Sequence, residues 1–221
     1  MLPGKVKLMP SGNLGVKQNS LVAYGESSIS GGIAARLGMQ VVMDFYTYMA
    51  LVGAGYQVRG GTLSVPLVGD VLITDTAAEM CADAASGTTI IPVAANISFN
   101  LAAATLFETA GKSVATASSA GTAFVPLPLR SNGAAATSTA RVQAAGAVTV
   151  TAELATTTLR HFSWGHPIAA GAWPTIYDWS PRTPPVLVGP RCFYVQIAGD
   201  TTGPSYFASF DYLEAPTATL L

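Results

Sequence analysis

Few side chains of this chain are of the types that perform acid–base or nucleophilic catalysis. The two histidines, His161 and His166, are five residues apart around Trp164. On a strand an odd spacing directs two side chains to opposite faces, so we expect these histidines not to share a metal ion. No G-x-S-x-G nucleophile motif is present. A carboxylate pair such as Glu153 with Asp178 stays open, because sequence does not reveal proximity. We predict no catalytic residues and no enzymatic activity.

Two further patterns bear on ligand binding. Residues 110–113, Ala-Gly-Lys-Ser, match the end of a P-loop, but the glycine that the motif needs five residues before Gly111 is replaced by Leu106. We therefore expect no nucleotide site. Four acidic residues are spaced too widely for a calcium loop. We predict that they form a solvated acidic face, with a cation between subunits as the alternative: Asp70, Asp75, Glu79 and Asp83.

The chain contains two cysteines, Cys81 and Cys192, far apart in sequence. A chain of 221 residues does not need a disulfide to be stable. We expect two buried thiols, and the sequence leaves their pairing open. We assign no metal ligand and no cofactor. The N-glycosylation pattern that begins at Asn96 is interpreted as chance, because no secretory signal is visible.

The charge content is unusually low. Asp, Glu, Lys and Arg make up 10% of the residues, against about 25% in ordinary soluble domains. A membrane span needs about 20 mostly apolar residues, but the stretch at 39–53 is shorter and the one at 93–107 is interrupted by polar residues. The net charge of −1 gives no general attraction to nucleic acid. We infer that neighbouring molecules cover much of the surface, and we predict homo-oligomers.

From residue 38 onward the sequence predicts strands. Residues 96–101 alternate between polar and apolar side chains, which indicates a strand with one packed face. Similar runs, including 40–51, 70–74, 88–93, 148–154 and 175–179, recur every 8–12 residues between Gly- and Pro-rich turns, a spacing typical of sandwiches and barrels. Helices at 74–85 and 102–111 are the alternatives. We predict an all-β domain over residues 38–221, either a sandwich or a barrel.

Residues 1–37 are predicted to form an extended N-terminal arm. Glycine or proline recurs every few residues, so this segment cannot build a core of its own. It carries spaced apolar residues that would suit an inter-subunit clasp, and a flexible terminus is the alternative. The expected arm contacts are Val6, Leu8, Leu14, Val16, Leu21 and Val22.

Residues 60–81 (GGTLSVPLVGDVLITDTAAEMC) and 192–214 (CFYVQIAGDTTGPSYFASFDYLE) look like paired jelly-roll strands. With the Gly/Ser/Ala/Thr-rich texture, the low charge and the arm, the chain resembles the decoration, or cement, proteins of tailed-phage capsids. The resemblance implies an all-β, jelly-roll-like antiparallel β-sandwich over residues 38–221. It further implies a trimer on the capsid surface of a virion, made in the host cytoplasm, whose arm reaches over the major capsid protein or a neighbour. Two alternatives remain: a capsid-forming jelly-roll subunit, or a receptor- or glycan-binding fibre tip with an aromatic pocket around residues 164–179.

Overall fold

The computed structural model describes residues 32–34, 40–42, 44–62, 64–101, 106–143, 146–154, 156–167, 175–201 and 203–219. It divides the chain into two compact units, Met1–Tyr48 and Met49–Leu221. The second unit is built almost wholly of antiparallel strands. In the described part of the chain, no helix is long and apolar enough to cross a membrane.

The segment at 40–51 is only partly the strand that the sequence predicts. β1 (Gly32–Ala34) pairs with β2 (Gln40–Val42), but α1 (Phe45–Leu51) is a helix. The Asp44 carboxylate accepts the backbone N–H groups of Tyr46 and Thr47, each at 3.0 Å. This is a helix N-cap, and it decides the local structure against the strand propensity of the aromatic residues that follow.

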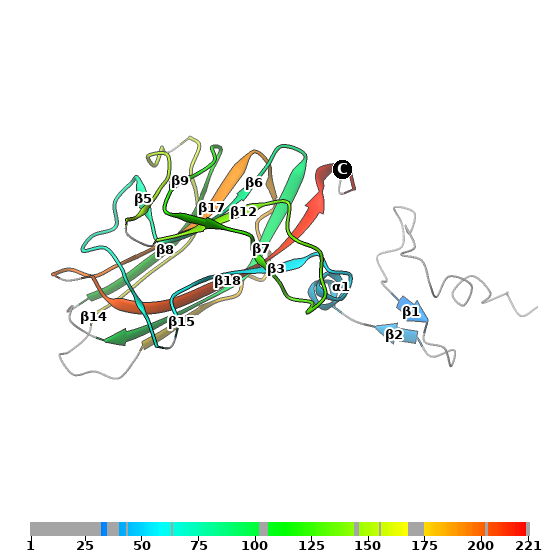
Figure 1. Ribbon diagram of the computed structural model, residues 1–221, viewed down its shortest axis with the longest axis horizontal. Coiled ribbons are helices and arrows are strands. Elements are labelled where there is room, and N and C mark those ends of the chain that lie inside the picture. The colour runs from blue at the N-terminus through cyan, green and yellow to red at the C-terminus, as the bar shows by residue number, and fades with distance from the viewer. Residues whose placement is uncertain are drawn as a thin grey trace, which may run out of the picture. The chain divides into compact units, whose positions relative to one another are not determined.

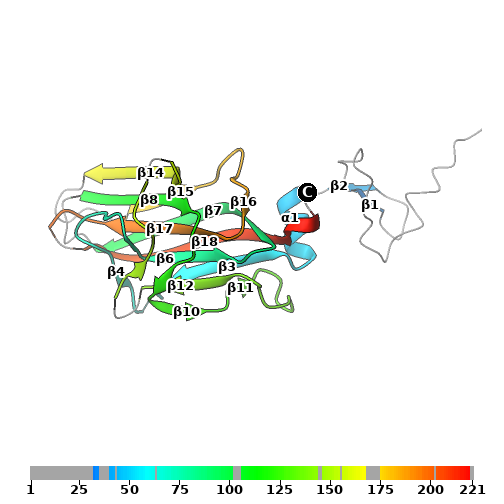
Figure 2. The ribbon, with the colours of Figure 1, turned by 90° about the horizontal axis from the view of Figure 1, so that it is seen from above.

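Two large sheets form the second unit (Figures 1 and 2). The seven-stranded sheet runs β11 (Leu127–Pro128), β3 (Gly55–Gly60), β18 (Ser205–Pro216), β7 (Thr88–Leu101) and β15 (Thr175–Trp179), with β16 (Leu187–Val188) paired to β7 and β4 (Leu67–Val68) to β18. The six-stranded sheet runs β10 (Thr122–Phe124), β12 (Thr139–Val142), β6 (Met80–Ala84), β17 (Arg191–Ala198), β8 (Leu106–Val114) and β14 (Leu159–Pro167). A small third sheet contains β5 (Ala77–Ala78), β13 (Val148–Thr149) and β9 (Ser119–Ala120), and a 3₁₀ helix spans Thr217–Thr219.

The strand order is that of a jelly roll. Among the described elements, the strands of five or more residues are, in chain order, β3, β6, β7, β8, β14, β15, β17 and β18. Numbered from one to eight, they run 1-8-3-6 in one sheet and 2-7-4-5 in the other. Consecutive strands thus mostly alternate between the sheets, as in the two Greek keys of a jelly roll. The all-β sandwich and the jelly-roll-like topology predicted from the sequence are confirmed.

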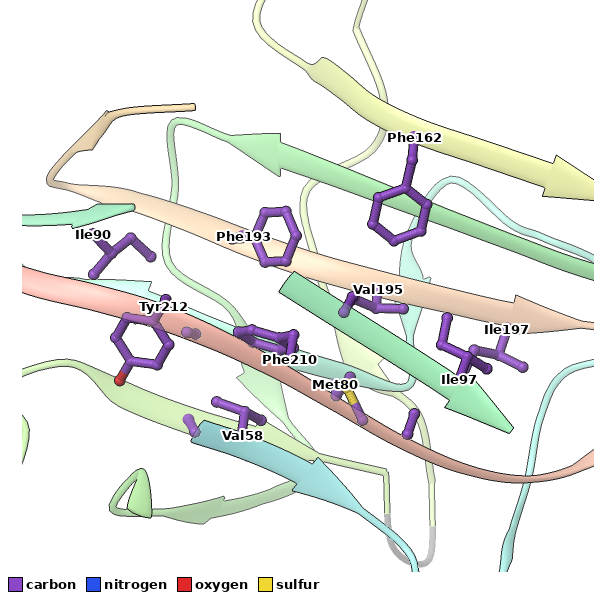
Figure 3. Packing of buried hydrophobic residues seen from close by; sticks show 14 of the residues in the cluster. Val58, Met80, Ile90, Ile97, Phe162, Phe193, Val195, Ile197, Phe210 and Tyr212 are labelled. Carbon is purple, nitrogen blue, oxygen red and sulfur yellow. The ribbon is translucent and has the colours of Figure 1, made fainter. Parts of the chain in front are cut away.

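The core lies between the two sheets and is dominated by β17 and β18. Figure 3 shows Phe193 and Val195 of β17 directed toward Phe210 of β18 and Ile97 of β7. The Phe193 and Phe210 ring centroids are 5.1 Å apart in an edge-to-face arrangement. Along β18 every second side chain from Tyr206 to Tyr212 is buried, because successive strand residues face opposite sides.

Several predicted strands shift or merge in the structure. Residues 88–93 and 96–101 belong to the single strand β7, and 175–179 coincide with β15. Residues 70–74 are not a strand, since Asp70 makes only an isolated bridge to Ala198 and residues 71–72 form a bend. Within 148–154 only Val148–Thr149 pairs as a strand. The alternative helix at 74–85 is wrong, because β5 and β6 form there. At 102–111 the described part, from Leu106, is strand β8.

Candidate functional site

The six arm residues predicted to make contacts lie outside the described residues, so that prediction stays untested. They are Val6, Leu8, Leu14, Val16, Leu21 and Val22. The interaction and chemical features considered below therefore belong to the second unit, Met49–Leu221.

The candidate carboxylate pair does not come together. Asp178 lies on the outer face of the seven-stranded sheet, where its Oδ1 accepts a hydrogen bond from Asn96 Nδ2. Glu153 lies over the outer face of the six-stranded sheet and bonds Lys112 Nζ at 2.6 Å and Arg160 Nη2 at 2.5 Å. The hydrogen bond from Lys112, aided by Arg160, holds the Glu153 pKa below its usual value. With the core between them, Glu153 and Asp178 cannot act on one substrate.

The P-loop-like residues 110–113 are part of an antiparallel strand, β8. Gly111 leaves space for the Phe162 ring: a Cβ on Gly111 would lie 2.1 Å from Phe162 Cε1. The Lys112 side chain is buried and pairs with Glu153 instead of extending toward a ligand. These residues therefore serve sheet packing, which agrees with the expectation of no nucleotide site.

The two histidines make separate contacts. His161 Nε2 and Ser113 Oγ are 2.9 Å apart, and burial, with a smaller effect of the Arg191 charge, lowers the His161 pKa. His166 stacks on Trp164 with ring centroids 5.6 Å apart. The described contacts thus give each histidine a local packing role.

Aromatic side chains fill the space between the open edges of the two sheets. Phe162 and Trp164 come from β14, and Tyr177 and Trp179 come from β15. The Phe162–Trp179 and Trp164–Tyr177 centroids are 5.1 Å and 5.2 Å apart, and Trp164 also stacks on Phe99 of the core. These rings are engaged with one another and with the core, which favours a packing role over a glycan pocket. Trp173 lies outside the described residues.

A buried carboxylate occupies the bend between β5 and β6. Glu79 is 1% exposed, and its Oε2 accepts the Ile197 N–H at 2.7 Å. Burial is the main cause that raises the Glu79 pKa to about 8, and the nearby Asp70 charge adds to it. The charge of Glu79 in turn contributes, after burial, to the raised pKa of Tyr206, whose hydroxyl donates to Gln143 Oε1 at 3.3 Å. Glu79 is therefore held largely in its neutral form near pH 7.

A second polar cluster contains both cysteines, which are buried and not joined by a disulfide. Cys81 Sγ lies 3.0 Å from Ser118 Oγ. Ser118 donates its N–H to Asp83 Oδ1 at 2.9 Å and its hydroxyl to Asp83 Oδ2 at 2.6 Å. Burial raises the pKa of the Cys192 thiol well above its ordinary value. The expectation of two buried thiols is confirmed.

The solvated acidic face predicted for the 70–83 segment is wrong for Glu79 and Asp83. Asp75 is exposed, but Glu79 is buried, and Asp83, like Asp70, is only half-buried. A bend at Glu79 separates β5 from β6, so that Ala78 packs beside Cys81 rather than opposite to it. The sequence shows alternation in this region, but the position of a bend within it depends on which strands the segment pairs with.

Sequence reasoning missed a surface of exposed apolar side chains between β3 and β5. Within residues 65–72, four side chains are 47% to 65% exposed: Val65, Val68, Val71 and Leu72. We call this surface the 65–72 patch. Its backbone is fixed, since Gly69 N–H donates to Pro204 O and Gly199 N–H donates to Asp70 O, both at 2.9 Å. Leu67 packs inward against the core. The patch is thus an apolar surface on an anchored backbone.

The outer face of the seven-stranded sheet also has a hollow of about 320 Å³. Its lining includes Arg59 of β3, Asn96 of β7, and Phe207 and Ser209 of β18. The alternating patterns of these strands identify an outward face, but the sequence gives no signal for a hollow there.

Comparison with models of known protein families, with curated proteins and with solved structures gave no match. The jelly-roll assignment therefore rests on the strand order alone.

Proposed function

We propose that this protein is a structural virion protein, a decoration or cement protein that stabilises a viral shell through its arm and through contacts between subunits. The observation that carries the proposal is the 65–72 patch on a charge-poor jelly roll. Burial of apolar surface contributes about 25 cal/mol per Å². Clustered exposed apolar side chains typically mark protein–protein contact surfaces.

The distribution of charge supports the same proposal. Among the described residues, the ion pairs join Lys112 and Arg160 to Glu153, and Arg141 to Asp83. These pairs engage charges within the molecule, in a chain where only 10% of residues are charged. A surface with few free charges does not oppose the close packing of identical subunits, because like-charge repulsion is small.

A capsid-forming subunit is the second candidate, and the strand order favours it. Jelly rolls of two Greek keys occur in viral capsid proteins as well as in lectins and cupins. Both candidates require self-association or docking on a shell. They differ in whether this chain alone can close a particle.

The test is the mass of the purified protein, measured by light scattering alone and with preformed shells. We expect wild-type protein to form small oligomers, with a trimer favoured, and to co-sediment with shells. Val65→Ser combined with Leu72→Ser should weaken both oligomer formation and binding to shells at least tenfold. The reason is that each substitution removes apolar contact area from the 65–72 patch. The matched control is Leu154→Ser combined with Leu159→Ser, which changes exposed leucines elsewhere on the surface.

Three outcomes separate the candidates. Closed particles formed by this chain alone would replace the decoration proposal by the capsid-forming one. A wild-type monomer without affinity for shells would contradict both. Equal effects of the patch and control substitutions would remove the patch from the contact surface.

A further inference from the structure

The register of β6 and β17 brings three potential metal ligands onto one face of the six-stranded sheet. Cys192 pairs directly with Asp83, and Tyr194 pairs with Cys81. Residues two apart on a strand share a face, so the side chains of Cys81, Asp83 and Cys192 all project from the outer face. Their ligand atoms, two thiol sulfurs and a carboxylate oxygen, lie within 4.8 Å of one another.

This part of the outer face is covered. The second apolar cluster packs there and contains Val148, Val150 and both cysteines. Figure 1 shows β5 and β9 on the side of β17 and β8 that faces away from β7 and β18. Both cysteines are fully buried, whereas the Asp83 side chain is 12% exposed. Of the three side chains, the Asp83 carboxylate is therefore the one that reaches solvent.

The neighbours of Asp83 resemble the outer shell of a metal site. The two hydrogen bonds from Ser118 fix the carboxylate, and the Ser118 hydroxyl also lies beside Cys81. Arg141 Nε is 3.9 Å from Asp83 Oδ2. Partners that orient ligands in this way are a common feature of protein metal sites. Two thiolates and a carboxylate carry three negative charges, which a divalent ion and the Arg141 guanidinium would together neutralise.

We propose that Cys81, Asp83 and Cys192 bind one Zn²⁺ ion that links β6 to β17. Zinc accepts both thiolate and carboxylate ligands at about 2.0–2.3 Å, which places neighbouring ligand atoms roughly 3.3–3.8 Å apart in a tetrahedron. Ligand atoms already within 4.8 Å reach that spacing by small side-chain movements. Ca²⁺ and Mg²⁺ require oxygen ligands and do not suit two thiols. On binding, the two thiols release their protons to solvent, and the fourth position goes to water.

The test uses the full chain, reduced and stripped of metal, with Co²⁺ as a spectroscopic probe. We expect one equivalent of Co²⁺ to produce a thiolate-to-cobalt charge-transfer band and the intense visible bands of tetrahedral cobalt. One equivalent of Zn²⁺ should then abolish these bands and raise the Tm. A reduced wild-type protein with two titratable thiols but no cobalt band would overturn the proposal, whether or not any variant folds.

Substitutions at a proposed ligand, at its hydrogen-bond partner and at a control position test where the ion binds. Cys192→Ser should abolish the charge-transfer band, and Ser118→Ala should weaken Co²⁺ binding about tenfold, as expected for loss of an orienting partner. The control is Asp75→Asn, an exposed carboxylate on the same segment, which should bind as wild type does. Circular dichroism checks that each variant is folded. If neither thiol can be titrated after air oxidation and the reduced protein does not bind Co²⁺, the cysteines form a disulfide instead and the proposal fails.

Discussion

At the scale of single residues, the buried carboxyl group of Glu79 makes the stability of this protein depend on pH. Its carboxyl group is buried among β-strands, where it accepts the Ile197 N–H at 2.7 Å and has no ion-pair partner among the described residues. Such a group is tolerated in its neutral form and costs free energy when charged, because burial removes the solvation of the ion. The protein therefore has a proton-dependent contribution to stability at its centre.

Replacing Glu79 by Gln should flatten the dependence of stability on pH. The folded-state pKa of about 8 exceeds the ordinary 4.5, so the folded state holds a proton that the unfolded state releases as the pH rises. The contribution of Glu79 to stability is therefore fully present below the pKa that Glu79 has in the unfolded state. It declines as the pH rises toward the pKa that Glu79 has in the folded state. We expect the wild type to lose on the order of a few kcal/mol of unfolding free energy from about pH 5 to about pH 9.

Urea unfolding of wild type and Glu79→Gln across this pH range measures the effect. Gln keeps an oxygen acceptor for the Ile197 N–H but cannot ionise, so the variant should lose much less stability. Glu108→Gln, a half-buried position on β8, is the matched control and should keep the wild-type slope. Parallel curves for wild type and Glu79→Gln would mean that Glu79 ionises without penalty.

At the scale of elements, the pairing of β8 with β14 depends on Gly111, which has no side chain to occupy the space that the Phe162 ring fills. Gly111 lies opposite Phe162 in the register, next to a β-bulge between Arg160 and Phe162. The Phe162 ring occupies the space over Gly111 and is held there by contacts with Tyr177 and Trp179. The edge of the six-stranded sheet and the aromatic cluster between the two sheets are therefore coupled through one glycine.

Gly111→Ala should destabilise the protein by about 1–3 kcal/mol, the usual cost of an overpacked core. The new Cβ would overlap the Phe162 ring, which Tyr177 and Trp179 contact. Thermal unfolding measures the change, and Gly165→Ala on β14 is the control, since its nearest neighbouring atom would be at 3.8 Å. Adding Phe162→Leu should recover part of the loss in Gly111→Ala. Equal Tm values for the Gly111→Ala and Gly165→Ala variants would show that the ring moves aside without cost.

At the scale of the whole molecule, the jelly roll is complete within the second unit. Its eight long strands all lie within Met49–Leu221. Among the described residues, the sandwich core runs from Tyr56 to Tyr212, all within the second unit. A chain organised in this way can devote its N-terminal residues to other contacts without loss of the folded core.

Deletion of residues 1–37 should therefore leave the sandwich folded but weaken attachment to shells. Far-ultraviolet circular dichroism and Tm report the fold, and co-sedimentation with shells reports attachment. Exchange of Val6, Leu8 and Leu14 for serine in the full-length chain separates apolar contacts from the mere length of the arm. If both altered proteins bound shells as tightly as wild type, the arm would have no clasping role.

The sequence by itself determined the fold class and several element positions. Alternation at 96–101 and the β-rich run at 175–179 lie within β7 and β15 of the structure, because a strand with one buried face imposes a period of two on its own residues. It also indicated two buried thiols and no P-loop. At 40–51 the same reasoning failed in part, because one capping carboxylate, Asp44, outweighed the strand propensity of its neighbours.

Only the tertiary structure decided which residues meet. The grouping of Cys81 and Asp83 with Cys192, more than a hundred positions away, follows from the pairing of β6 with β17. The burial of Glu79 and the exposure of the 65–72 patch follow in the same way from the strands that cover one segment and leave another open. Local patterns reflect the period of one strand, whereas these features arise from the register and order of strands distant in sequence, which no local window contains.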